Sequence, residues 1–162
     1  MLELGNKRKG DFVYKHFFEA RGFRHVSVDW NGQDGSLKMD LRKPLNLGTF
    51  DMVTNFGTTE HVSENKWDGQ VECWRNIAEA MHVGSVLISA TPKAGTAKNH
   101  GTWYPQFDFF REFAKLNGMT VERLYEDGEG TAMPLIYARL VRTDDVQFQM
   151  TRVGMYHNNR LG

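Results

Sequence analysis

The chain has 162 residues, a length that suits one domain of ordinary size. Hydrophobic residues make up 40% and charged residues 25%, a globular composition that argues against long disordered stretches. The 20 Lys and Arg residues balance the 20 Asp and Glu residues, so the sequence lacks the positive excess of a dedicated nucleic-acid wrapper.

The sequence also argues against a protein held together by disulfides or cysteine-bound zinc, and against a membrane-spanning or secreted protein. The one cysteine, Cys73, allows neither an internal disulfide nor a cysteine-rich zinc site. No apolar run approaches the roughly 20 residues of a membrane span, and the first residues do not form a basic-then-apolar signal segment. We therefore expect a soluble, cytoplasmic protein without a membrane partner.

Strand-like and helix-like stretches alternate through the first half of the chain. Residues 10–21 carry apolar side chains at roughly helical spacing, and Gly22 ends this expected helix. Apolar, β-branched or alternating segments predict strands. These expected strands cover residues 2–4, 25–29, 35–41 and 50–56.

The second half continues the alternation. The apolar stripe of residues 68–82 and the aromatic-rich residues 107–116 predict two helices. Strands are expected at residues 85–90, 119–125 and 135–141. Residues 143–162 are polar with scattered apolar side chains, and they form either a loose tail or a strand that pairs elsewhere.

This order of elements indicates an α/β fold. Strands that alternate with helices form mainly parallel sheets with right-handed crossovers. No helix separates the strands at 119–125 and 135–141, so we expect an antiparallel edge hairpin there. We place one domain at residues 1–142 and treat residues 143–162 as a C-terminal tail or edge extension.

Acidic residues follow two neighbouring expected strands. In an open parallel sheet, ligands bind beyond the carboxyl ends of the strands, near the change in strand order. Asp29 can accept hydrogen bonds from both hydroxyls of a ribose, and Trp30 beside it offers a flat apolar face for a base. Asp40 can accept from an exocyclic amine such as that of adenine. Either acid alone can instead belong to a turn, but the pair favours an adenosine-type ligand.

With these residues the sequence resembles the class I S-adenosylmethionine-dependent methyltransferases, of the methyltransferase type 11 kind, over residues 1–142. Glu3-Leu4-Gly5 matches the acidic-x-Gly signature, Asp29 the ribose-binding acid, and Asp40-Leu41 the adenine site. Residues 50–62 and 83–88 match the segments around the fourth and fifth strands of the family. The resemblance implies a Rossmann-like three-layer sandwich of about seven strands, with S-adenosylmethionine as cofactor. It implies cofactor contacts from Glu3, Gly5, Asn6, Asp29, Trp30, Asp40, Leu41, Asn55 and Phe56.

Two features depart from the family pattern. The glycine-rich loop usually has a second glycine where this chain has Lys7 or its neighbours, and only Gly10 follows. Lys7, Arg8 and Lys9 either favour the cofactor carboxylate or form a solvated loop. Relatives also carry an N-terminal helix over the pocket, whereas this chain begins on its first expected strand. An open cleft is therefore expected, or a cover supplied by a second copy in a homo-oligomer or by a partner subunit.

Other cofactor classes find less support in the sequence. A dinucleotide fold needs G-x-G-x-x-G to bring backbone N–H groups against a pyrophosphate, but the run from Gly5 to Gly10 has only the outer glycines. No G-K-[ST] of a P-loop occurs. The 6 histidines show no H-x-x-x-H type of ligand spacing, so the sequence predicts no metal site.

Methyl transfer from a sulfonium is an in-line displacement, in which the enzyme mainly aligns the acceptor and excludes water. A general base helps when the acceptor is a hydroxyl or a protonated amine. His61, just beyond the fourth strand, is the candidate catalytic base, although it could instead cap or pack the loop, and Glu60 could orient it. His100 and Tyr104, after the fifth strand, are the candidate substrate-binding residues, with a structural role as the alternative.

Two functions from different classes follow. One is a methyltransferase that acts on a small-molecule or sugar- or nucleotide-linked acceptor. The other is a non-catalytic protein or subunit that binds, senses or sequesters S-adenosylmethionine. Methylation of RNA or DNA through Lys7, Arg8, Lys9, Arg152 and Arg160 is disfavoured, because no Asp/Asn-Pro-Pro-Tyr-type motif follows the fourth strand.

Overall fold

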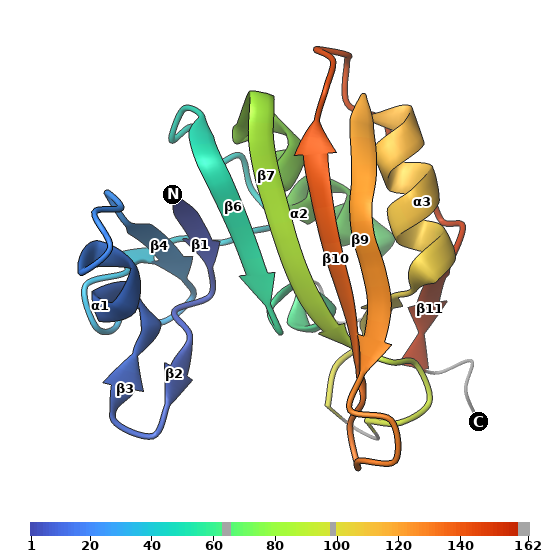
Figure 1. The fold of residues 1–162 in the computed structure, drawn as a ribbon, viewed down its shortest axis with the longest axis horizontal. Helices are drawn as coiled ribbons and strands as arrows, with labels where there is room; N and C mark the ends of the chain where they lie inside the picture. The colour runs from blue at the N-terminus through green and yellow to red at the C-terminus, as the bar shows by residue number, and fades with distance from the viewer. Residues whose placement is uncertain (63–65, 98–99, 159–162) are drawn as a thin grey trace.

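The computed structural model describes residues 1–62, 66–97 and 100–158 of the chain. Its centre is a seven-stranded sheet in the order β5-β4-β1-β6-β7-β10-β9 (Figure 1). Neighbours from β5 to β7 are parallel, whereas β10 is antiparallel to both β7 and β9. The strands are β1 (Leu2–Leu4), β4 (Val26–Asp29), β5 (Leu37–Lys38), β6 (Phe50–Phe56), β7 (Met81–Pro92), β9 (Met119–Asp127) and β10 (Leu135–Arg142).

Two helices, α2 (Trp67–Glu79) and α3 (Phe107–Leu116), cover one face of the sheet (Figure 1). Trp74 of α2 meets Phe109 and Phe113 of α3, with ring centroids 4.6 and 5.1 Å apart, and all three side chains are fully buried. Because burial of such a side chain contributes roughly 1.5–3 kcal/mol, this aromatic cluster holds both helices against the sheet.

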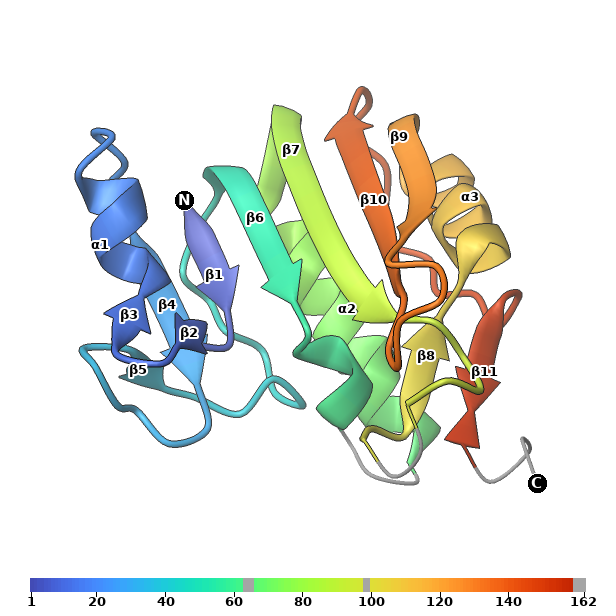
Figure 2. The ribbon, with the colours of Figure 1, turned by 60° about the horizontal axis from the view of Figure 1, so that its bottom comes forward.

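The mainly parallel, Rossmann-like α/β architecture is confirmed. Its third layer is thin, because within the described ranges the face opposite α2 and α3 carries a single helix, α1 (Tyr14–Glu19), beside β1 and β4 (Figures 1 and 2). Phe18 of α1 stacks on His25 there, with ring centroids 5.8 Å apart. The antiparallel pair has β9 as the outer strand, while β10 lies between β7 and β9.

The expected helix at residues 10–21 is only partly correct. A small hairpin of β2 (Arg8–Lys9) and β3 (Phe12–Val13) comes first, and α1 begins at Tyr14. Gly10 lies at the turn with a φ of 60°, a left-handed conformation that an α-helix does not contain. The helix expected at residues 68–82 likewise ends at Glu79, because Met81 already pairs with Phe50 in the sheet.

Residues 143–158 pack against the rest of the domain. β11 (Met155–His157) pairs antiparallel with β8 (Trp103–Pro105) in a separate two-stranded sheet (Figure 2). Phe148 and Met150 pack against the core. Of the two options for this segment, the structure shows a strand that pairs outside the main sheet. None of the helices in the described ranges is long and apolar enough to cross a membrane.

Candidate functional site

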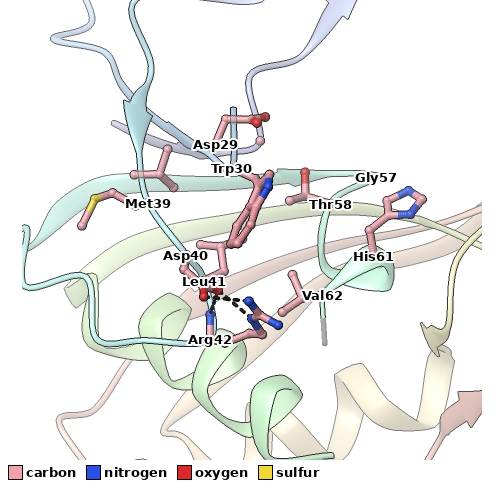
Figure 3. Close-up of a pocket in the computed structure, with 12 residues that line it drawn as sticks. Asp29, Trp30, Met39, Asp40, Leu41, Arg42, Gly57, Thr58, His61 and Val62 are labelled. Carbon is pink, nitrogen blue, oxygen red and sulfur yellow. Dashed lines mark hydrogen bonds and ion pairs between the residues drawn. The ribbon is translucent and has the colours of Figure 1, made fainter. Parts of the chain in front are cut away.

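A pocket of about 360 Å³ opens beyond the carboxyl ends of β1, β4, β5 and β6 (Figure 3). The strand-end pocket, as we call it, lies where the rule for open parallel sheets places a ligand. It brings together six of the residues that the sequence analysis selected: Gly5, Asp29, Trp30, Asp40, Leu41 and His61.

Gly5 makes the tight exit from β1 that forms one wall of this pocket. It has a φ of 71°, and its N–H donates to the Val28 carbonyl at 2.8 Å. A Cβ at this position would collide with the side chain of Thr58, whose hydroxyl donates to the Leu4 carbonyl at 2.7 Å. Only glycine therefore lets β1 and the loop after β6 approach this closely.

Asp29 is fixed by backbone donors. The N–H of Asn6 donates to Oδ2 at 3.0 Å, and the N–H of Asn31 donates to Oδ1 at 2.9 Å. A carboxylate has about four acceptor positions, so lone pairs remain for ligand hydroxyls. Asn6 thus supports the site through its backbone, while its side-chain amide donates to the Gln33 carbonyl at 3.0 Å.

Asp40 has a side-chain partner, Arg42, that was not predicted from the sequence. Arg42 donates to both of its carboxylate oxygens at 2.9 Å, and the Arg42 backbone N–H adds a third bond at 3.0 Å (Figure 3). These hydrogen bonds lower the pKa of Asp40. Trp30 is 67% exposed, with the Arg42 guanidinium 5.4 Å from its ring centroid. A ligand amine at Asp40 must therefore share the carboxylate with Arg42.

Besides Asn6, three predicted cofactor residues do not line the strand-end pocket. Glu3 is fully buried, and its Oε2 lies 3.0 Å from Nε2 of His25. The buried Asn55 amide donates to the hydroxyls of Thr59 and Ser89, both at 2.9 Å. These two side chains organise the sheet and the loop, while Phe56 lines a neighbouring cavity.

Tyr104 anchors a loop. It is buried, and its hydroxyl accepts the Gly101 N–H at 2.8 Å and lies 3.1 and 3.0 Å from the Ala97 and Gly101 carbonyls. Burial raises the pKa of Tyr104. Because its polar atom is already satisfied by the loop, the geometry matches the structural alternative better than a substrate contact.

A second cavity, of about 320 Å³, shares Gly57 with the strand-end pocket. This side cavity is lined by Lys7, Tyr14, Glu60 and His100 among others. Glu60 lies on the 3₁₀ turn η1 (Thr59–His61), which follows β6. Gln70 of α2 holds that turn, because its amide donates to the carbonyls of Thr59 and Val62 at 2.7 and 2.8 Å.

Glu60, His61 and His100 form one cluster. Oε1 of Glu60 lies 3.9 Å from Nε2 of His61 and 3.6 Å from Nε2 of His100. Burial raises the pKa of Glu60 to about 7. Burial, and then the neighbouring His100, lowers the pKa of His61, so its imidazole is neutral at neutral pH. No sequence spacing pointed to this cluster, because His100 joins it only through the tertiary fold.

The basic residues considered for nucleic-acid binding have separate environments in the structure. Arg8 pairs with Asp34 at 3.0 Å, Lys7 lines the side cavity, and Arg152 lies 4.4 Å from the Trp67 ring centroid. Arg160 lies outside the described residues.

No protein-family model and no curated protein sequence matches the chain. Solved structures do match it. The 1,6-didemethyltoxoflavin-N1-methyltransferase of Burkholderia thailandensis, with S-adenosylhomocysteine bound, is 14% identical with a TM-score of 0.61, over 88% of this chain and 71% of that one. The N-methyltransferase NodS of Bradyrhizobium japonicum WM9, in complex with S-adenosylhomocysteine, is 12% identical with a TM-score of 0.63, over 88% and 77%. The [4+2]-cyclase SpnF is 11% identical with a TM-score of 0.56, over 88% and 74%.

These similarities concern the architecture, since identity is low throughout. Each of the three similarities extends over 88% of this chain. The chain therefore has the Rossmann-like fold of the class I S-adenosylmethionine-dependent methyltransferases.

Proposed function

We propose that this chain binds S-adenosylmethionine in the strand-end pocket and transfers its methyl group to a small-molecule acceptor. The observation that carries the proposal is the meeting of Asp29 and Asp40, from the ends of adjacent strands, with the exposed indole of Trp30 in one pocket. The two methyltransferases of similar fold were both crystallised with S-adenosylhomocysteine, which supports the choice of cofactor.

The pocket offers a complementary group for each part of the nucleoside. Asp29, held by two backbone N–H groups, accepts hydrogen bonds from the ribose hydroxyls. Trp30 and Leu41 supply apolar surface for the adenine ring, and Asp40 accepts from its amine. The turn at Gly5 lets the cofactor lie close to the main chain.

The reaction is an in-line displacement. A lone pair on the acceptor attacks the methyl carbon, and the electron pair of the carbon–sulfur bond passes to sulfur, which leaves as a neutral thioether. His61 lines the same pocket and is neutral at neutral pH, so we assign it as the base that takes the proton of a hydroxyl or ammonium acceptor.

Binding without methyl transfer is the second candidate function. The specific observation in its favour is that a protein of similar fold is named for a [4+2] cyclisation, because one fold can host unrelated reactions. In that case the chain would sense or sequester the cofactor, and the strand-end pocket would keep its role.

A thermal-shift series with S-adenosylmethionine, S-adenosylhomocysteine, NAD and ATP tests the cofactor assignment. A ligand at a hundred times its Kd stabilises the native state by about 2.7 kcal/mol, so the first two compounds should raise Tm and the last two should not. No shift with either sulfur compound would overturn the proposal. Formation of S-adenosylhomocysteine from S-adenosylmethionine with a pool of small-molecule acceptors supports the enzyme, and binding without any formation supports the second candidate.

A further inference from the structure

We propose that Glu60, His61 and His100 bind a divalent transition-metal ion of the zinc type between the strand-end pocket and the side cavity. The metal site stands on its own geometry. Only the contact of the metal with a methyl acceptor rests on the proposed function.

The three side chains have the spacing and chemistry of a metal site. One ligand atom from each lies within 4.8 Å of the other two. Tetrahedral zinc, with bonds near 2.1 Å, holds neighbouring ligand atoms about 3.4 Å apart. The Glu60–His100 and Glu60–His61 distances of 3.6 and 3.9 Å are close to this value, and the two histidine ligand atoms lie within 4.8 Å of each other. Two imidazoles and one carboxylate are a common donor set for zinc and for iron.

Glu60 supplies the independent sign that a ligand is expected. It is fully buried, and neither carboxylate oxygen has a hydrogen-bond partner within the part of the chain that the structure describes. The imidazole nitrogens, at 3.6 and 3.9 Å, are beyond the roughly 3.2 Å of a good N–H···O bond. A buried charge is normally paired or bound to a metal, so a cation between these three groups would satisfy all of them.

The surrounding chain is shaped to hold this carboxylate. A Cβ on Gly101 would lie 2.8 Å from Cγ of Glu60, and a Cβ on Gly57 would lie 3.4 Å from its Oε1. The Glu60 carbonyl accepts the Thr102 N–H at 2.8 Å. The Gly101 backbone thus packs closely against the Glu60 side chain, and Nζ of Lys7 approaches the carboxylate on the Gly57 side, where a Cβ would lie 3.5 Å from it.

A metal at this position would lie between the strand-end pocket and the side cavity, where it could bind an acceptor. His61 lines the strand-end pocket, while Glu60 and His100 line the side cavity with apolar and aromatic residues such as Tyr14, Phe56 and Leu135. Three protein ligands leave at least one coordination position open, as in catalytic zinc sites. A hydroxylated ring in the side cavity would therefore place its oxygen on the metal.

If the proposed function holds, the metal takes over the activation of the acceptor. It lowers the pKa of the bound hydroxyl, which releases its proton to water. The oxygen lone pair then forms the bond to the methyl carbon, and the carbon–sulfur pair passes to sulfur. A metal-bound His61 has no free lone pair on that nitrogen, so it would then be a ligand and not the base.

Metal titration of the full chain, treated with a chelator and free of S-adenosylmethionine, tests the site. We expect one equivalent of Zn²⁺ by calorimetry and of Co²⁺ by visible absorption, with Mg²⁺ binding more weakly. Glu60→Gln and His100→Ala should each weaken Zn²⁺ binding at least a hundredfold. His82→Ala is the matched control, because His82 also faces a carboxylate, Asp51 at 3.2 Å, on the exposed surface. Absence of Zn²⁺ binding, saturation by Mg²⁺ alone, or unchanged affinity in both cluster variants would overturn the proposal.

Folding defects can be separated from ligand loss. The side chains of His61 and His100 are 46% and 38% exposed, so alanine at either position should leave the metal-free Tm unchanged while metal affinity falls. Glu60→Gln should leave the metal-free Tm equal or higher, because it removes the desolvation cost of a buried carboxylate. A large fall in the metal-free Tm of Glu60→Gln would assign Glu60 a purely structural role.

Catechol serves as the probe for the acceptor position. Added to the Co²⁺-loaded chain, it should change the visible spectrum saturably. Leu135→Trp, which fills the side cavity, should abolish that change with Co²⁺ affinity intact. An unaltered spectrum in the unsubstituted protein would overturn the acceptor contact. The metal titration and the catechol experiment do not use S-adenosylmethionine. A chain that binds the metal but not the cofactor would therefore refute the proposed function and leave the metal site standing.

Discussion

The strand-end pocket and the side cavity share Gly57 but treat their carboxylates in opposite ways. Asp29 accepts two backbone N–H bonds and Asp40 is paired with Arg42, whereas Glu60 has no hydrogen-bond partner among the described residues. The partners orient these carboxylates before any ligand arrives. An unpartnered buried carboxylate is unfavourable until a proton or a cation reaches it. The first cavity therefore presents oriented acceptors to the hydroxyl and amine donors of a ligand, whereas the second holds a carboxylate that a cation would stabilise.

The largest effect is expected from Asp29→Ala. Two hydrogen bonds from the ribose to a charged carboxylate are lost, each worth about 1.5–3 kcal/mol, so the Kd for S-adenosylhomocysteine should rise about a thousandfold. Calorimetry measures the change. Asp34→Ala is the control, because Asp34 is an acid of the same loop that pairs with Arg8. Equal affinity in Asp29→Ala and the unsubstituted chain would contradict the role of Asp29.

Glu60 should make the metal-free chain less stable as the pH rises. Its pKa is raised from 4.5 to about 7, so on raising the pH the unfolded chain releases this proton before the folded chain does. The free energy of unfolding should fall by about 3 kcal/mol between roughly pH 4.5 and 7, then level off. Glu60→Gln removes this component, so denaturant titrations of both proteins at about pH 5, 6, 7 and 8 isolate it. A difference between the two that is independent of pH would contradict the expectation.

A smaller effect is expected at Asp40, because Arg42 already shares its carboxylate. The unsubstituted chain should bind S-adenosylhomocysteine more tightly than S-inosylhomocysteine, which presents a carbonyl in place of the amine. Asp40→Asn should reduce this preference about tenfold, as expected for one hydrogen bond to a charged group. Competition binding measures the ratio, and an unaltered ratio would show that Asp40 does not read the amine.

Tyr104→Phe should have the smallest effect, and on stability alone. The variant loses one hydroxyl and leaves the Gly101 N–H without its acceptor, so the free energy of unfolding should fall by about 1 kcal/mol. The affinity for S-adenosylhomocysteine should not change. Reduced affinity for a methyl acceptor with unchanged stability would restore the substrate-binding role that the sequence suggested.

The sequence predicted those features that depend on local pattern. The strands at Leu2–Leu4 and Phe50–Phe56 and the helix at Phe107–Leu116 have the expected bounds, because apolar periodicity and turn residues are local signals. Asp29 and Asp40 meet in one pocket because parallel strands end at the same edge of a sheet.

The remaining features depend on contacts between distant segments. The pairing of β8 with β11 and the approach of His100 to Glu60 have no local signature. The apolar spacing of residues 10–21 predicted a helix, but β2 and β3 form a hairpin there. Gly10 has a left-handed conformation, which fits the turn of the hairpin and not an α-helix. Arg42 is the exception, since Asp40-x-Arg42 is a local signal that could have been noticed.

The β8–β11 pairing links the last described strand to the histidine cluster. Beyond β11, Asn158 donates through its backbone to the Thr102 carbonyl at 2.9 Å and through its side chain to the Gly101 carbonyl at 3.0 Å. Gly101 directly follows His100, so the segment after β11 fixes the loop that carries this imidazole. Proteolytic removal of β11 and Asn158 would loosen one wall of the side cavity. The seven-stranded sheet would keep all its strand pairings, because β11 does not belong to it.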